Sequence, residues 1–434
     1  ASHNPATDSG VKFFDSEGYK SMPEDEDRIS VLAWELADGG LAAPQENTES
    51  LEEIDGLSLY RGALKMRLEV FESLFNTDFE SVDWSDVVAP QGLILDCSGG
   101  AATEWFAEGL SRRGLDGIEV SSRLDPINQD CGAGDFSPTA KWSIRELLME
   151  APSHRLLWTV AQRLEDNDGL PFWALGQIVG AALDGDGDRC LLIEGTSDGL
   201  QIVDGDRMCD DIMRAAISAR SGSWKMAASI ESDLGLTADL PRLGEHVSIT
   251  TAVGDRWLSA ALWPESGGRF LKSSEYPRVI GTEDSGHLVM PAPCPNQDDS
   301  WGLVGDGAAT LLASLLARAV LSKDGGGRAF QGGWKKRISI RPSVRDRWTG
   351  TNELSELVQT TAEEWCGTSL NRCEVEGEAA LMLLEGTLNG FPFSIAVRNS
   401  GTEAKTSISI RFSRGIDANG DELMSLLEET MTPH

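Results

Sequence analysis

The chain has 434 residues, with 37 Lys and Arg against 70 Asp and Glu, so its formal net charge is −33. A hydrophobic content of 40% is enough to build cores and excludes global disorder. The length predicts about two to four domains. The carboxylate excess argues against electrostatic nucleic-acid binding, which needs clustered Lys and Arg. It is typical of adaptation to high salt or of a very soluble protein.

No run of the sequence approaches the ~18 consecutive apolar residues of a membrane helix. The opening residues, ASHNPATDSG, have neither the basic region nor the apolar stretch of a secretory signal. The seven cysteines are scattered without a CxxC pair, which predicts reduced, mostly buried thiols. The five histidines do not supply the clustered ligands of a zinc site. We expect a cytoplasmic protein, a monomer or a homodimer, with no membrane or nucleic-acid partner.

Hydrophobic periodicity predicts a helix over residues 57–75. After a Pro-Gln-Gly breaker at 90–92, residues 93–96 are predicted to form a buried strand, and 98–101 a glycine turn. A helix over 103–113 and a strand over 117–120 follow. Strand, turn, helix and strand make a βαβ unit, which predicts an α/β architecture.

Later segments continue the alternation of strands and helices. The glycines at 325–327 and 332–333 indicate a domain linker, and the last ~100 residues form an α+β module. The predicted strands are 178–183, 190–193, 393–397 and 406–412, and the predicted helices are 308–321, 353–365 and 421–431.

Asp184, Asp186 and Asp188 alternate with glycines and precede Arg189, between two predicted strands. Three carboxylates at every second residue can converge on one hard cation. A calcium EF-hand would need Gly at the sixth loop position and an acidic residue at the twelfth, where this sequence has Arg189 and Gly195. A compact loop of this kind suits Mg²⁺ with positions open to a phosphate. The alternative is a solvated acidic turn, although burying three Asp without a cation is costly.

A second motif is Ser2-His3-Asn4-Pro5, followed by Gly10 and Lys12. A serine in a loop whose backbone is restricted by a proline can be a nucleophile or a phosphate carrier, and Lys12 can supply charge or a proton. The alternative is an N-terminal turn in which the serine is a cap.

Two further polar loops follow predicted strands. In TEDSGH, at 282–287, Glu283 and Ser285 can bind neighbouring sugar hydroxyls, or the segment is an ordinary loop. In RNSGTEAK, at 398–405, Arg398 and Lys405 supply charge while hydroxyls and backbone N–H groups complete a phosphate cradle. A plain surface turn is the alternative here.

Together and in this order, the four motifs resemble those of the α-D-phosphohexomutase family. Its members carry a catalytic serine loop (TASHNP…NGxK), a metal loop (DGDxDR), a sugar loop (GExSGH-like) and a phosphate loop (RxSGTEP). The resemblance covers nearly the whole chain, including LDCSGGA at 95–101 and VGDR at 253–256. It implies an α/β fold of three similar mixed α/β domains plus a C-terminal α+β domain around a central cleft. The domains would span residues 1–88, 89–203, 204–328 and 329–434.

The resemblance also implies a role for each motif. Ser2 is the phosphorylated serine, and its phosphate joins Asp184, Asp186 and Asp188 as a ligand of Mg²⁺. Around the phosphoryl group lie His3, Arg189 and Lys12, the last as a general acid or base. The residues implied to bind substrate are Glu283, Ser285, His287, Arg398, Ser400, Gly401, Thr402 and Lys405.

The predicted activity is a phosphohexose mutase that interconverts hexose 6-phosphate and hexose 1-phosphate. It passes through a phosphoserine enzyme and a bisphosphorylated sugar, with hexose 1,6-bisphosphate as activator. Gly187 in the metal loop and the segments GVKFF and EDSGH are closest to the phosphoglucosamine mutase branch, which predicts glucosamine 6-phosphate as substrate. A phosphomannomutase or phosphoglucomutase is the alternative within the family. A phosphosugar-binding protein without turnover is the alternative outside it.

Three departures from the family pattern stand out. The chain begins at the serine motif, whereas members have a preceding strand and an Arg-bearing loop, so we expect a first domain that is truncated at its N-terminus. Ser9 stands where Asn is usual, and Ala404 where Pro is usual. Neither substitution removes a charge or a ligand.

Overall fold

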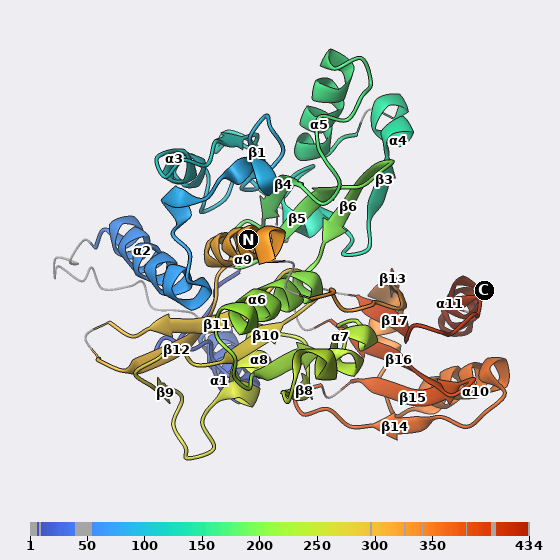
Figure 1. The fold of residues 1–434 in the computed structure, drawn as a ribbon. Helices are drawn as coiled ribbons and strands as arrows, with labels where there is room; N and C mark the ends of the chain where they lie inside the picture. Colours follow the sequence, from blue (N-terminus) through green and yellow to red (C-terminus); the bar gives the residue numbers. More distant parts are fainter. Residues whose placement is uncertain are drawn as a thin grey trace.

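The computed structural model describes residues 7, 10–39, 54–150, 152–295, 297–324, 327–340, 342–378, 380–400 and 405–432. Within them, three β-sheets follow one another along the chain, in residues 93–203, 225–305 and 334–412, with helices packed around them (Figure 1). The fold is mixed α/β, as the sequence predicts. In this described part, every helix is too short or too polar to cross a lipid bilayer.

The first sheet has the strand order β2-β1-β4-β5-β6-β3. β1 is parallel to β2 and β4, and the other pairs are antiparallel. The predicted βαβ unit is confirmed, but its helix is shorter than 103–113, because Glu104 has a φ of 76° that no α-helix accommodates. The elements are β1 (Leu93–Asp96), α3 (Phe106–Ser111), β2 (Gly117–Glu119), β3 (Lys141–Ser143), α4 (Ile144–Met149), α5 (Arg155–Asp166), β4 (Ile178–Leu183), β5 (Cys190–Gly195) and β6 (Gly199–Val203).

The second sheet repeats this topology, with the order β8-β7-β10-β11-β12-β9 and the same pattern of parallel and antiparallel pairs. In each sheet the fourth and fifth strands along the chain form a hairpin, and the sixth leads into a long helix, α6 (Gly205–Ala219) or α9 (Gly307–Asp324). The hairpin loops therefore occupy equivalent positions. The elements are β7 (Lys225–Ser229), α7 (Leu234–Ala238), β8 (Val247–Thr251), α8 (Asp255–Leu262), β9 (Leu271–Lys272), β10 (Val279–Thr282), β11 (Leu288–Pro293) and β12 (Ser300–Gly305).

The described part of residues 1–88 is mainly helical. It holds α1 (Pro23–Asp38), α2 (Gly56–Phe75) and the 3-10 turns Phe79–Ser81 and Trp84–Asp86. Its strand-like pairings are isolated bridges, Phe14 with Lys20 and Val88 with Ile178 at the edge of β4. The predicted 57–75 helix is confirmed as α2, which packs against α9.

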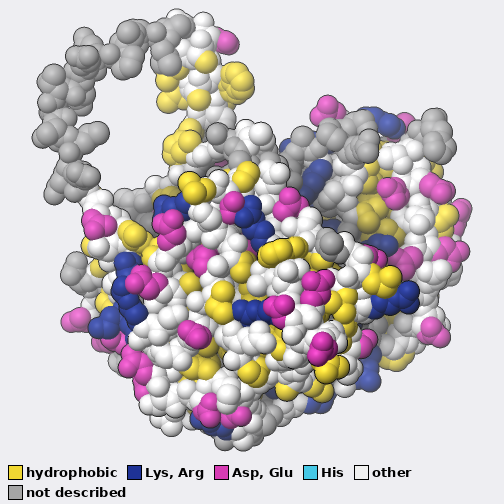
Figure 2. All heavy atoms as spheres, turned by 90° about the horizontal axis from the view of Figure 1, so that it is seen from above, with side chains coloured by type: hydrophobic (Ala, Val, Ile, Leu, Met, Phe, Trp, Pro, Cys, Tyr) yellow, Lys and Arg dark blue, Asp and Glu magenta, His cyan; other side chains and the backbone are white. Residues whose placement is uncertain are grey.

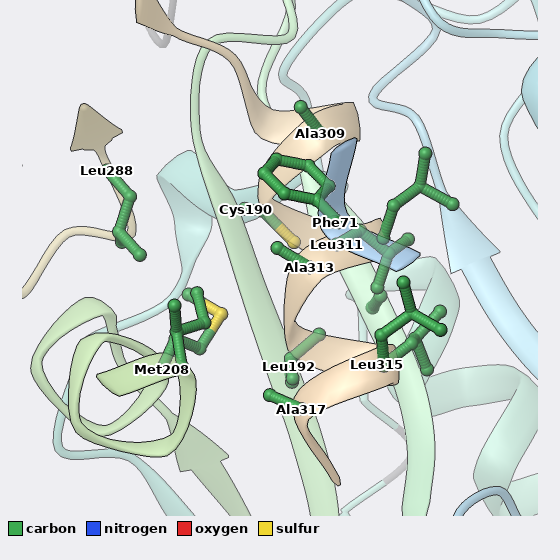
Figure 3. Packing of buried hydrophobic residues seen from close by; sticks show 14 of the residues in the cluster. Phe71, Cys190, Leu192, Met208, Leu288, Ala309, Leu311, Ala313, Leu315 and Ala317 are labelled. Atoms are coloured by element: carbon green, nitrogen blue, oxygen red, sulfur yellow. The ribbon is translucent and has the colours of Figure 1, made fainter. Parts of the chain in front are cut away.

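Helix α9 packs between the two six-stranded sheets. Figure 3 shows its Leu311 and Leu315 among Phe71 of α2, Leu192 of β5 and, farther off, Leu288 of β11. Because these side chains belong to one buried cluster, the two modules share a core and cannot slide past each other without opening cavities. This shared core fixes the relative position of their hairpin loops.

The C-terminal module is an antiparallel sheet of order β13-β17-β16-β15-β14, covered on one face by two helices. Apolar residues of the three strands β13, β17 and β16 alternate with polar ones, so one face packs on the helices and the other faces the rest of the protein. The predicted linker lies between α9 and β13. The elements are β13 (Trp334–Ile340), α10 (Glu353–Cys366), β14 (Asn371–Cys373), β15 (Met382–Leu388), β16 (Phe391–Asn399), β17 (Thr406–Phe412) and α11 (Gly420–Met431).

All seven cysteines are free in the structure, and four of them are buried. Acidic side chains are scattered over the face shown in Figure 2 and do not gather in one patch. On this face the negative charge is thus spread out rather than gathered at one binding site.

Candidate functional site

The metal motif forms the loop of the β4–β5 hairpin. Gly187 has a φ of 77°, a conformation that favours glycine, and its N–H donates to the carbonyl oxygen of Asp184 at 3.1 Å. The turn brings the carboxylates of Asp184, Asp186 and Asp188 together, each offering an oxygen within 4.8 Å of the others. Strands flank the loop on both sides, as predicted, whereas a calcium EF-hand loop would be flanked by helices. The residues predicted to hold the cation do converge.

The electrostatics of this loop fit a cation. Burial raises the pKa of Asp184 to about 7, and the charges of Asp188 and Asp186 add to that effect. One oxygen of Asp188, Oδ1, is buried and has no hydrogen-bond partner among the described residues. Three carboxylates with such an oxygen suit a hard divalent ion such as Mg²⁺.

Lys12 reaches the same carboxylates from the N-terminal segment. Its Nζ donates to Asp186 and, at 3.0 Å, to Oδ2 of Asp188. Burial by itself would lower the pKa of Lys12, but the charges of Asp188 and Asp186 outweigh burial and raise it. In this arrangement Lys12 is therefore an ammonium ion, which can donate a proton or stabilise negative charge but cannot accept a proton.

The predicted sugar motif is the loop of the β10–β11 hairpin. The N–H of Glu283 donates to the carbonyl oxygen of His287 at 3.0 Å, which closes the loop, and Ser285 Oγ donates to Oε2 of Glu283 at 3.1 Å. His287 lies 4.0 Å from Asp255. Burial lowers the pKa of His287, but Asp188 and Asp255 more than reverse this and raise it. The histidine therefore connects the sugar loop electrostatically to the metal loop.

The two hairpin loops are also joined through the backbone. The N–H of Cys190 donates to the carbonyl oxygen of Gly286 at 3.0 Å. The long helices add two crossed contacts: Gly307, at the start of α9, donates to Gly187 at 2.8 Å, and Gly205, at the start of α6, donates to Asp284 at 3.3 Å. Each helix thus begins against the hairpin loop of the opposite module, because the modules share one core.

The phosphate motif follows β16 in the C-terminal module. Oε1 of Glu231 accepts a hydrogen bond from Arg398 Nε at 3.1 Å and lies 3.1 Å from Nη2 in the same ion pair. Arg398 Nη1 lies 3.8 Å from Glu378. The N–H of Ser400 donates to the carbonyl oxygen of Lys405 at 2.9 Å, so these two residues lie at the mouth of the loop. The structure thus shows both ends of the predicted cradle.

A short segment before α8 connects the sugar loop with Arg398. The adjacent N–H groups of Val253 and Gly254 donate to Glu378, at 3.3 Å, and to Oε1 of Glu283. Glu378 in turn faces Arg398. The segment at 253–256 therefore connects Glu283 of the predicted sugar motif with Arg398 of the predicted phosphate motif.

The predicted residues fall into three sets. One set converges around the paired hairpin loops: Lys12, Asp184, Asp186, Asp188, Arg189, Glu283, Ser285 and His287. The second lies in the C-terminal module: Arg398, Ser400 and Lys405. The third lies outside the described residues: Ser2, His3, Gly401 and Thr402.

Sequence reasoning missed the charged residues that join the C-terminal sheet to the second module. Lys335 Nζ lies 2.8, 3.1 and 3.4 Å from carboxylate oxygens of Asp204, Asp284 and Asp206. Arg337, two residues further along β13, binds Glu231. The alternation of basic and apolar residues in WKKRISI was the available signal, because it places Lys335 and Arg337 on the face opposite the apolar core.

No protein-family model matches the chain. A phosphoglucosamine mutase of Jannaschia sp. (strain CCS1) is 31% identical over 328 residues, 75% of this chain and 58% of that relative. The chain thus spans a little under three fifths of the length of this curated relative. By structure, Aspergillus fumigatus N-acetylphosphoglucosamine mutase in complex with glucose 1,6-bisphosphate matches with a TM-score of 0.57 at 16% identity, over 99% of this chain and 86% of that one.

A second solved structure agrees on the fold. An N-acetylglucosamine-phosphate mutase of the α-D-phosphohexomutase superfamily, in its substrate complex, matches with a TM-score of 0.53 at 14% identity, over 86% of this chain and 65% of that one. At this identity the similarity concerns the fold. The chain therefore has the fold of the α-D-phosphohexomutases, as its motifs predict.

Proposed function

We propose that this chain, which has the α-D-phosphohexomutase fold and is a relative of phosphoglucosamine mutases, interconverts glucosamine 6-phosphate and glucosamine 1-phosphate. One observation carries the proposal. The acidic loop of Asp184, Asp186 and Asp188 is hydrogen-bonded through Cys190 to the loop that holds Glu283 and Ser285. The loops that we assign to the cation and to the sugar hydroxyls thus lie side by side, which supports phosphoryl transfer to a sugar.

The acidic loop would hold Mg²⁺ through Asp184, Asp186 and Asp188, together with a phosphate oxygen on Ser2. When bound, the ion neutralises the negative charge that develops on the phosphoryl oxygens. Lys12, held as an ammonium beside Asp186 and Asp188, supports the same charge from the chain itself.

Ser2 would carry the phosphoryl group that is transferred. The bond between phosphorus and Ser2 Oγ breaks as a sugar hydroxyl forms the new P–O bond, and the hydroxyl proton passes to the serine oxygen. Glu283 and Ser285 orient the sugar by accepting and donating hydrogen bonds. The product of this step is a bisphosphorylated sugar, which returns its other phosphoryl group to Ser2.

The second phosphate would be held by Arg398 with Ser400, Gly401, Thr402 and Lys405. Because either phosphate of the bisphosphate can occupy this cradle, the sugar can turn around between the two transfers. Arg398 supplies a charge-assisted fork suited to a phosphate group. The cleft between the modules would be formed by four domains, divided near residues 88, 203 and 328.

The test is a direct assay of the reaction. Glucosamine 6-phosphate is incubated with the protein, Mg²⁺ and a trace of glucose 1,6-bisphosphate, and ³¹P NMR follows the appearance of the 1-phosphate. Parallel reactions with mannose and glucose 6-phosphates decide between this substrate and the phosphomannomutase or phosphoglucomutase alternative. Mass spectrometry of the purified protein should find phosphate on Ser2.

Binding of all three sugar phosphates without any conversion would favour a phosphosugar-binding protein instead. A phosphosite confined to other residues would overturn the role of Ser2. If a 1-phosphate forms only from mannose 6-phosphate or glucose 6-phosphate, the assigned substrate would be wrong but the proposed mechanism would stand.

A further inference from the structure

Two arginines of the C-terminal sheet converge on one carboxylate of the second module. Arg398 of β16 donates to Oε1 of Glu231, and Arg337 of β13 donates to the other oxygen, Oε2. Glu231, which follows β7, is only 7% exposed. The contacts join residues 106 and 167 positions apart along the chain.

The sheet is built so that these two guanidinium groups can meet. β17 lies between β13 and β16, and its register places Ser409 opposite Arg337 and Ser407 opposite Arg398. Directly opposed residues of antiparallel strands project from the same face. Because Ser407 and Ser409 are small, the two long side chains can lean toward each other over the central strand.

A polar cavity of about 200 Å³ opens beside Arg337 and Glu231. Its lining includes Glu231, Lys335 and Arg337, with hydroxyls from Ser339 and Ser409 of the same sheet face. Residues 136–139, which precede β3 in the first sheet, also line the cavity. An anion bound at Arg337 therefore has room beside it for a polar group such as a sugar.

We propose that Arg337 is a second phosphate-binding residue beside Arg398, and that Glu231 is an internal anion that holds both arginines until a phosphate group of the substrate replaces it. Carboxylate and phosphate present similar oxygen pairs to a guanidinium fork. The Arg398 side chain is 14% exposed and that of Arg337 30%. Among the described residues, Glu231 is the one carboxylate that both guanidinium groups contact, with Asp284 3.6 Å from Arg337 and Glu378 3.8 Å from Arg398. In the ligand-free protein Glu231 therefore neutralises charge that a bound phosphate could neutralise instead. The inference rests on the proposed function only for the identity of the anion.

Competition between Glu231 and phosphate for the two arginines predicts whether loss of the Glu231 charge tightens or weakens phosphate binding. If the carboxylate must leave before phosphate enters, the apparent affinity for phosphate is reduced by the fraction of molecules in which the arginines are available. Removing its charge must then tighten phosphate binding. If Glu231 served only to position Arg398, the same change would weaken binding.

The experiment is isothermal titration calorimetry of the full chain with inorganic phosphate and with glucosamine 6-phosphate, at constant Mg²⁺. Glu231→Gln should tighten the binding of both probes by about tenfold. Arg337→Gln should weaken it by about tenfold or more, because a charge-assisted hydrogen bond is lost. Arg372→Gln is the matched control, an arginine of β14 that pairs with Glu356 away from the cavity, and it should change neither value.

A second measurement keeps the test decisive if Glu231→Gln is poorly stable. Glu231→Asp shortens the side chain so that one carboxylate can no longer meet both arginines, and its thermal midpoint should fall without phosphate and recover with it. Weaker phosphate binding in Glu231→Gln, or unchanged binding in Arg337→Gln, would overturn the inference. Either result could occur in a fully active mutase. Conversely, tighter phosphate binding in Glu231→Gln and weaker binding in Arg337→Gln, in a protein without mutase activity, would support the anion site and contradict the proposed reaction.

Discussion

The backbone N–H of Cys190 donates to the carbonyl oxygen of Gly286 at 3.0 Å, which ties the first residue of β5 to the sugar loop. Gly286 has a φ of 88°, and a Cβ atom at this position would lie 2.1 Å from the carbonyl oxygen of Cys190. No side chain fits there without separating the two loops. The site's central alignment therefore depends on a glycine as much as on its charged residues.

Gly286→Ala should separate the metal loop from the sugar loop. The positive φ and the overlap with Cys190 together should destabilise the protein by about 2 kcal/mol or more, measured by chemical denaturation. Mutase turnover should fall further than the loss of folded protein explains. Gly62→Ala is the control, because Gly62 is an exposed position of α2 with nothing within 4 Å of a Cβ atom there, and it should stabilise the protein by about 0.5–1 kcal/mol.

Asp186→Asn should weaken Mg²⁺ binding with little change in fold, because the amide keeps the shape of the side chain and removes its charge. Calorimetry with Mg²⁺ alone should show the loss, and turnover should fall with it. EDTA should abolish the activity of the unaltered protein. The matched change Asp421→Asn, at an exposed partner of Lys336, should leave both values unchanged. Full turnover after exhaustive chelation would refute the metal site.

Arg398→Ala should raise KM for both the 1-phosphate and the 6-phosphate sugar. A charge-assisted contact worth roughly 1.5–3 kcal/mol corresponds to about ten- to a hundredfold in KM. Both directions should suffer, because the same cradle holds whichever phosphate is not being transferred. Kinetics measured in each direction check this, and an increase confined to one direction would contradict a shared cradle.

Asp206→Asn should change how stability depends on pH. Burial raises the pKa of Asp206 to about 7, against an ordinary value of 3.8, although Lys335 opposes the shift. Between those two values the folded state binds a proton that the unfolded state does not, so this group's contribution is present below about pH 4 and is lost as pH rises through about 7. The neutral amide escapes that loss. The variant should match the unaltered protein at or below about pH 4 and exceed its thermal midpoint at pH 8.

The opposite trend, with the Asn variant losing stability relative to the unaltered protein as pH rises, would show that Asp206 is stabilised as an anion by Lys335. Comparing the two proteins at each pH removes the contribution of the other titrating groups. The amide oxygen of Asn can still accept the N–H of Asp233, which donates to Asp206 at 2.7 Å. A uniform loss at every pH would therefore indicate a change in packing.

Much of the site could be predicted from sequence because its polar and charged residues lie in short, continuous segments. The alternation of aspartate and glycine at 184–188 predicts a cation loop by spacing alone, and the three carboxylates do converge. The flanking apolar runs are strands β4 and β5, as predicted. The predicted helix before β2 is longer than the observed one, because the residue types at 101–105 give no indication of the positive φ of Glu104. Local pattern decides local structure, except where a tertiary contact selects an unusual backbone conformation.

What the sequence by itself determined was the chemistry of each loop and the strands or helices beside it. Only the tertiary structure decided which loops meet. Two modules of the same topology share one core around α9, which brings the loop after β4 against the loop after β10. Likewise, Glu231 meets Arg337 and Arg398 because three distant strands pack together. Contacts over such separations depend on how whole modules bury their apolar faces, and no short segment encodes that.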